Sequence, residues 1–111
     1  MAGGKVALVT GASRGAGRGV ARGLGQLGYK VYVTGRTVEP GDAKGWDGSV
    51  LPGTVAETAE AVTAAGGEGV ALLCDHADDA QTAEVFERIA RDEGRLDVLF
   101  NNAAYMHPEL I

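Results

Sequence analysis

Short apolar runs alternate with longer amphipathic stretches along this chain. The apolar runs are rich in β-branched residues, and they predict strands over residues 5–9, 30–34, 69–74 and 96–100. The stretches between them repeat apolar residues at helical spacing, and they predict helices over residues 16–26, over 54–65 and from Asp78 onward. The expected apolar faces are Val20, Leu24 and Leu27 in the first helix and Val85, Phe86, Ile89 and Ala90 in the last.

Residues that cap helices stand at the expected helix ends. Gly28 follows the first helix, where a glycine in a left-handed conformation commonly closes the last turn. Thr54 and Glu57 form the spacing of a capping box before the second helix. Asp78, with Gln81 three residues on, is expected to cap the third helix.

Strands that alternate with crossover helices indicate one α/β domain over residues 1–111, with a parallel sheet and right-handed connections. The apolar runs are nearly continuous, as expected of strands that helices cover on both faces. Residues 37–53 break this rhythm because they carry two prolines and several glycines without periodicity. They predict a long loop after the second strand.

Composition narrows the class of protein. The chain has 111 residues, of which 45% are hydrophobic and 23% charged, and these fractions are typical of globular domains rather than disordered ones. The net charge of −5 disfavours general binding to nucleic acid. No apolar run approaches the roughly 18 residues of a membrane span. With a single cysteine, a disulfide scaffold is excluded, and a cytoplasmic protein that does not insert into membranes is expected.

Two groups of polar residues are not expected to form sites. Cys74, Asp75 and His76 are metal-ligand types, but neighbouring residues of a strand point to opposite faces and no second cluster stands at zinc spacing. We therefore expect no metal site, and we expect Cys74 to be a small buried hydrophobe. Asp92, Glu93 and Asp97 are expected to form a solvated face.

The segment from Thr10 to Gly17 lies between the first strand and the first helix and has the pattern G-x-x-x-G-x-G. The N-terminus of a helix presents unpaired N–H groups and partial positive charge to an anion, and glycines let the backbone approach a pyrophosphate. In this position the pattern predicts a phosphate-binding loop. The alternative is a tight strand-to-helix turn that binds nothing.

Three features of the sequence together resemble the short-chain dehydrogenase/reductase family. They are the Thr10–Gly17 motif, Asp75 after the third strand, and the segment Leu96–Ala104, in the family's order and spacing. The resemblance spans nearly the whole chain and implies a Rossmann-type, doubly wound parallel sheet in three αβα layers, truncated after about the fourth strand. Ala104 stands where the family usually has glycine.

The resemblance also implies which residues hold a nicotinamide cofactor. The loop residues Thr10, Gly11, Ser13, Arg14, Gly15 and Gly17 would cradle the pyrophosphate of NAD(P). Asp75 would meet the adenine edge, and His76 would contribute a backbone contact. Asn102, Ala103 and Ala104 would line the adenosine side and brace the sheet.

The end of the second strand favours NADP(H) over NAD(H). An NAD site usually places a carboxylate there to bind the ribose 2′-hydroxyl, whereas this chain has Thr34, Gly35 and Arg36. A guanidinium pairs with a 2′-phosphate through two parallel hydrogen bonds, and Arg14 offers a second one from the loop. The alternative is that Arg36 points into solvent. Residues 37–53 either fold over the adenosine end or form a solvated insertion.

The family's proton donor is the tyrosine of a Tyr-x-x-x-Lys motif beyond a fifth strand, with a serine that steadies the substrate oxygen. Tyr105 is followed four residues later by Glu109 rather than lysine, so we assign no catalytic residue. The chain is expected to supply the cofactor-binding half of an oxidoreductase that transfers hydride between nicotinamide and a small carbonyl or alcohol substrate. The alternatives are a non-catalytic NADP-binding or redox-sensing module and an inactive fragment.

A last expectation concerns assembly. In the family another strand pairs beside the fourth, so residues 96–100 are expected to form an exposed, hydrophobic sheet edge here. Such an edge favours association. We therefore expect either a homo-oligomer or a longer protein cut short.

Overall fold

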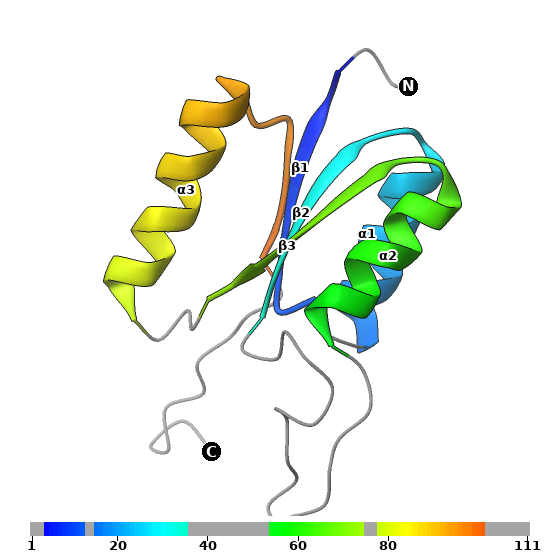
Figure 1. Ribbon diagram of the computed structural model, residues 1–111, viewed down its shortest axis with the longest axis horizontal. Helices are drawn as coiled ribbons and strands as arrows, with labels where there is room; N and C mark the ends of the chain where they lie inside the picture. Colours follow the sequence, from blue (N-terminus) through cyan, green and yellow to red (C-terminus); the bar gives the residue numbers. More distant parts are fainter. Residues whose placement is uncertain (1–3, 13–14, 36–53, 75–77, 102–111) are drawn as a thin grey trace, which may run out of the picture.

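The computed structural model describes residues 4–12, 15–35, 54–74 and 78–101. Within these residues strands and helices alternate from the first element to the last (Figure 1). The strands are β1 (Val6–Thr10), β2 (Lys30–Gly35), β3 (Glu68–Leu73) and β4 (Val98–Asn101), and the helices are α1 (Gly15–Gln26), α2 (Val55–Ala65) and α3 (Asp79–Glu93). The predicted elements are confirmed, with bounds that shift by one or two residues. The loop predicted over residues 37–53 lies outside the described residues.

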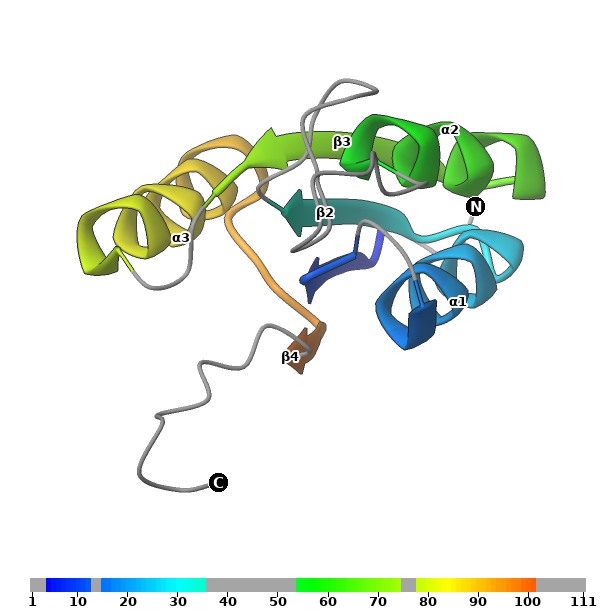
Figure 2. The same ribbon diagram turned by 90° about the horizontal axis from the view of Figure 1, so that it is seen from below.

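All the strands pair in parallel, in the order β3-β2-β1-β4. Val9 of β1, for example, lies beside Val33 of β2 on one side and Phe100 of β4 on the other. Helices α1 and α2 cover one face of the sheet and α3 covers the other (Figure 2). This is the three-layer α/β arrangement that the alternating pattern predicts.

Side chains alternate between the two faces and build a separate core on each. The core under α1 and α2 contains Ala7, Val9, Ala12, Ala21, Val31, Val33, Val55, Ala59 and Val62. The core under α3 contains Val6, Leu8, Tyr32, Cys74, Val85 and Ile89. Every residue of β1 is buried, because this strand has a neighbour on both edges and helices on both faces. Cys74 is 1% exposed, as predicted for a small core residue.

Glycines let α1, α2 and β3 approach one another closely. A Cβ atom on Gly25 of α1 would lie 2.7 Å from the carbonyl oxygen of Val62 in α2. A Cβ on Gly69 of β3 would overlap the carbonyl of Ala59. The layer on this face is therefore packed backbone to backbone, and its geometry depends on the absence of these side chains.

The predicted helix caps are confirmed. Gly28 has φ +85°, and its N–H donates to the carbonyl of Gly25 at 2.9 Å. The Thr54 hydroxyl accepts the N–H of Glu57 at 3.0 Å, and the Asp78 carboxylate accepts the N–H of Ala80 at 2.9 Å. These bonds satisfy helix-end groups that have no partner inside the helix.

Three residues expected on apolar helix faces are exposed instead. Helix α1 ends at Gln26, so Leu27 lies in the following turn and is 65% exposed. In α3 only Val85 and Ile89 reach the sheet, whereas Phe86 and Ala90 are exposed. Within the described residues α3 has no neighbouring helix on its face, and a single helix buries a narrower stripe than its sequence pattern predicts.

The expectation of a solvated acidic face is wrong for Glu93. Its carboxylate accepts the Tyr32 hydroxyl at 2.6 Å and pairs with the Lys30 ammonium at 2.7 Å, and its side chain is 14% exposed. Asp92 does lie on the surface, beside Arg88. Asp97 is exposed but accepts the N–H of Val6 at 2.9 Å. The last turn of α3 lies over the start of β2, which brings Glu93 to two partners distant in sequence.

These contacts shift three pKa values. The hydrogen bond from Lys30 holds the pKa of Glu93 below its usual value, and Tyr32 adds to the effect. The same carboxylate raises the pKa of Lys30. Burial, and then the bond to Glu93, raise the pKa of Tyr32 to about 12. All three groups therefore keep their bonding forms through neutral pH.

Strand β4 forms one edge of the described sheet, as predicted for residues 96–100. Leu99 is 51% exposed there, while Val98 and Phe100 pack partly against the core under α1. An open apolar edge of this kind favours association. Whether the protein self-associates through it stays a prediction.

Replacing Gly25 with alanine tests the close contact between α1 and α2. We expect Gly25→Ala to lower the free energy of unfolding by roughly 1–3 kcal/mol, because the new methyl group meets backbone that cannot move aside. The matched control is Gly23→Ala in the same helix, where a Cβ meets nothing within 4 Å, and it should stabilise by up to about 1 kcal/mol. Urea unfolding measures both, and equal effects would contradict the packing described.

Replacing Glu93 with glutamine tests the ionic cluster. A carboxyl whose folded pKa is lowered stabilises the fold above its usual pKa, and this contribution is lost as pH falls through the folded value. We therefore expect wild type to exceed Glu93→Gln in free energy of unfolding at neutral pH, and the gap to close below about pH 4. The control Asp92→Asn removes an exposed pair and should change stability little. If the difference in free energy of unfolding between wild type and Glu93→Gln does not change with pH, the charge of Glu93 does not contribute to stability.

Candidate functional site

The carboxyl ends of the strands meet at one edge of the sheet, which faces the viewer in Figure 2. Three hydrogen bonds of 2.9 Å join these ends. Ala12 N–H donates to the Thr34 carbonyl, Cys74 N–H donates to the Gly35 carbonyl, and the Thr10 hydroxyl donates to the Asn101 side-chain oxygen. The ends of β1, β2, β3 and β4 therefore form one continuous edge.

The connections of the sheet change face between the neighbouring strands β1 and β4. The chain leaves β1 for α1 on one face of the sheet, and it reaches β4 from α3 on the opposite face (Figure 1). Neighbouring strands whose connections diverge in this way mark the place where open α/β sheets bind ligands. The predicted phosphate loop lies at this place, because it directly follows β1.

The start of the loop has the geometry that an approach to a phosphate requires. Gly11 has φ +62°, a left-handed conformation that residues with a Cβ rarely adopt. Helix α1 begins four residues later, at Gly15, and has no acidic residue in its first turn. No carboxylate of that turn therefore opposes the positive end of the α1 dipole.

The loop backbone is held from two other elements. The N–H of Ala12 is bonded to β2 through Thr34, and its carbonyl accepts the Thr58 hydroxyl of α2 at 2.6 Å. Thr58 is missing from the residues predicted for the site. It occupies the buried stripe of α2 together with Val55 and Val62, and a hydroxyl at such a position must find a partner. A threonine within the apolar stripe of a helix is therefore the sequence signal that could have pointed to Thr58.

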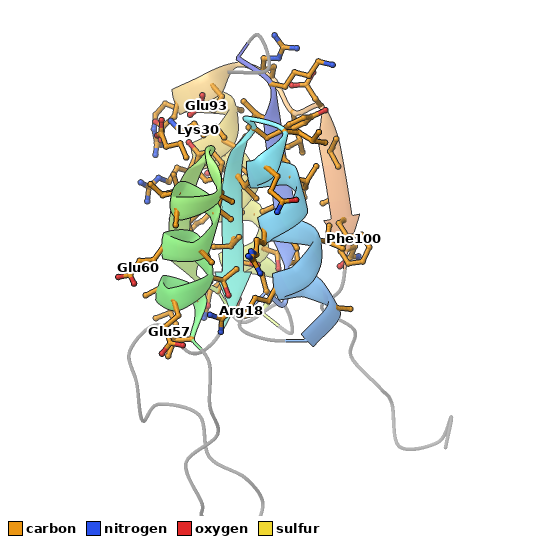
Figure 3. All side chains as sticks on the ribbon, turned by 90° about the vertical axis from the view of Figure 1, so that its right-hand side faces the viewer. Arg18, Lys30, Glu57, Glu60, Glu93 and Phe100 are labelled. Carbon is orange, nitrogen blue, oxygen red and sulfur yellow. The ribbon has the colours of Figure 1, made fainter. Side chains whose placement is uncertain are left out.

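An ion pair joins the same ends of the two helices. Arg18 of α1 lies 3.6 Å from Glu57 of α2, at the end of the molecule opposite Lys30 and Glu93 (Figure 3). Both side chains are well exposed, at 37% and 42%, so the pair contributes little to stability. It does neutralise the acidic residue in the first turn of α2, which packs beside α1.

The structure brings together the predicted site residues that it describes. Thr10 and Gly11 end β1, and Gly15 and Gly17 lie in the first turn of α1. The other predicted residues lie outside the described ones: Ser13, Arg14, Arg36, Asp75, His76, Asn102, Ala103 and Ala104. Three of these, Arg36, Asp75 and Asn102, directly follow in sequence the described residues Gly35, Cys74 and Asn101.

Two kinds of feature are absent from the described part of the chain. No group of three or more histidine, cysteine, aspartate or glutamate side chains in it is arranged to hold a metal ion. None of its helices is long and apolar enough to cross a membrane.

The fold is that of a doubly wound, Rossmann-like α/β domain. The family model "short chain dehydrogenase" matches residues 5–111, and the chain belongs to this family. It is 40% identical over 101 residues to dehydrogenase/reductase SDR family member 1 of Mus musculus, an alignment that covers 90% of the chain.

Two solved structures extend the comparison. A metagenomic short-chain oxidoreductase in complex with NADP superposes with a TM-score of 0.74 at 34% identity, covering 95% of the chain and 45% of that protein. The NADH-dependent reductase A1-R′ complexed with NAD gives 0.69 at 25% identity, covering 97% and 41%. The chain spans 28% of the length of the mouse relative. Because the two structures hold different cofactors, cofactor choice has to be argued from this chain's own residues.

Replacing Gly11 with alanine tests the strained start of the loop. At φ +62° an alanine costs about 1–2 kcal/mol relative to a relaxed position, so we expect Gly11→Ala to destabilise the protein by that amount. The control is Gly19→Ala in α1, where a Cβ meets nothing and alanine favours the helix. Thermal unfolding followed by circular dichroism compares them. If Gly11→Ala unfolds at the same midpoint temperature as wild type, the positive φ at Gly11 is contradicted.

Proposed function

We propose that this chain supplies the cofactor-binding part of an NADP(H)-dependent oxidoreductase that transfers hydride between nicotinamide and a small carbonyl or alcohol substrate. The observation that carries the proposal is the Gly11 loop at the divergence of β1 and β4, directly before an α1 helix without acidic residues in its first turn. Family membership supports the same reading.

The pyrophosphate of the cofactor is assigned to this loop and the first turn of α1. A diphosphate needs N–H donors, positive potential and close approach of the backbone, and a glycine-rich turn before a helix supplies all of them. Gly15 and Gly17 begin α1 and present no side chain to obstruct that approach. Thr10, Ser13 and Arg14 complete the proposed cradle.

The preference for NADP(H) rests on the arginine at the end of β2. The bond from Ala12 N–H to the Thr34 carbonyl joins the end of β2 to the loop, and Arg36 is the next residue after the strand. A carboxylate at this end of the sheet would repel a 2′-phosphate, and the sequence offers a guanidinium instead. One charge-assisted bond of about 1.5–3 kcal/mol changes affinity about tenfold or more.

The remaining proposed contacts lie after the other strand ends. Asp75, after β3, is assigned to the adenine edge, and its neighbour His76 to a backbone contact. Asn102, Ala103 and Ala104 come after β4 and are assigned to the adenosine side. When bound, the nicotinamide supplies the hydride donor or acceptor. The role of this chain is to bind and orient that cofactor, and we assign no proton donor to it.

Replacing Arg36 with alanine tests the preference. We expect the Kd for NADP⁺ to rise about tenfold or more in Arg36→Ala, while the Kd for NAD⁺ stays within about twofold. Isothermal titration calorimetry with both dinucleotides measures this, and Arg22→Ala on the exposed face of α1 is the matched control.

Other outcomes of the same titration have distinct meanings. Wild type that binds NAD⁺ as tightly as NADP⁺ would refute the preference alone. Wild type that binds neither dinucleotide would refute the proposed function.

A further inference from the structure

A buried hydroxyl joins helix α2 to the phosphate loop. Thr58 is 0% exposed, and its Oγ1 donates to the carbonyl of Ala12 at 2.6 Å. The same hydroxyl lies 3.2 Å from the carbonyl of Thr54, one turn earlier in the helix. The distance to Ala12 is the shorter one, so the bond to the loop dominates.

Ala12 is consequently held on both sides. Its N–H belongs to one peptide group and donates to Thr34 of β2 at 2.9 Å, while its carbonyl belongs to the next and accepts from Thr58. Two successive peptide planes are thus oriented immediately after Gly11, the residue with positive φ. These two hydrogen bonds come from β2 and α2.

The orientation of this carbonyl matters to an anion. A carbonyl oxygen that turned toward a phosphate would repel it, and a loop that samples several orientations must be ordered when the ligand binds. The bond to Thr58 holds the Ala12 oxygen in the buried layer that Ala12 shares with Val55 and Ala59. The ordering cost is therefore met in folding rather than in binding.

We propose that Thr58 is a positioning residue that pre-organises the loop for the pyrophosphate of a dinucleotide. This inference rests on the proposed function, because it assumes that the loop binds that group. It differs in its signature: the pyrophosphate is common to NADP and NAD, so loss of the Thr58 hydroxyl weakens both equally. Loss of Arg36 should weaken only NADP.

The test compares Thr58→Val, which keeps the shape but lacks the hydroxyl, with Thr58→Ser, which keeps the hydroxyl. We expect Thr58→Val to raise the Kd for both NADP⁺ and NAD⁺ about tenfold, as for one lost hydrogen bond, and Thr58→Ser to retain wild-type affinity. Titration calorimetry and the melting temperature are measured on each variant.

The matched control is Thr63→Val in the same helix. The Thr63 hydroxyl accepts the N–H of Gly69 at 3.0 Å and so joins α2 to β3 instead of the loop. Thr63→Val should lower the melting temperature without changing either Kd. Affinity that falls with stability alike in both valine variants would reduce Thr58 to a structural residue and overturn the inference.

A measurement on wild type tests the premise that the loop is ordered before the cofactor binds, and it is independent of whether Thr58→Val folds. Hydrogen exchange without cofactor should show the Ala12 amide protected to a degree similar to the amides of Leu8 and Val9 in β1. An Ala12 amide that becomes protected only after NADP⁺ is added would overturn the inference. Unchanged affinities in Thr58→Val would overturn it and leave the proposed function standing, whereas wild type that binds no dinucleotide would overturn both.

Discussion

Complete burial of β1 is the constraint on which the rest of this structure depends. A parallel strand in the middle of a sheet needs neighbours on both edges and helices on both faces, because every one of its side chains is apolar or must be bonded. Thr10, its one polar residue, is bonded to Asn101. To cover both faces, the chain must place α1 and α3 on opposite sides, and that divergence at the end of β1 is the feature that marks ligand sites in open α/β sheets. The candidate site is thus a consequence of how the core is covered.

Close packing then sets the position of the loop relative to its supports. Gly25 and Gly69 allow α2 to lie against α1 and β3 at backbone distance. A helix held farther away would not bring Thr58 within hydrogen-bonding distance of Ala12. Gly25 and Gly69 lie away from the site, yet they determine whether Thr58 can reach the loop. A side chain at either glycine would therefore affect the loop as well as the stability of this layer.

Local signals in the sequence predict most of the fold, and long-range contacts account for what they miss. Caps at Gly28, Thr54 and Asp78 depend on neighbouring residues, so they are readable from the chain. The exposure of Phe86 depends on how many helices share its face, and the pairing of Glu93 with Tyr32 spans 61 residues. The site divides in the same way: the glycine motif is visible in sequence, whereas the Thr58 contact spans 46 residues.

The two ends of the sheet are stabilised by different contacts, and the difference suits the anion proposed above. At the start of β2, charged groups are bonded to each other, as Lys30 is to Glu93. At the opposite end two contacts involve neutral groups: the Thr10 hydroxyl bonds the Asn101 side chain, and the Thr58 hydroxyl orients the Ala12 carbonyl of the loop without adding charge. A carboxylate in place of a hydroxyl could also orient the loop backbone, but its charge would oppose the positive end of α1. Glu57 brings an acid to this end from the first turn of α2, and Arg18 neutralises it. Glu57 is thereby prevented from opposing the positive end of α1 as an unpaired charge.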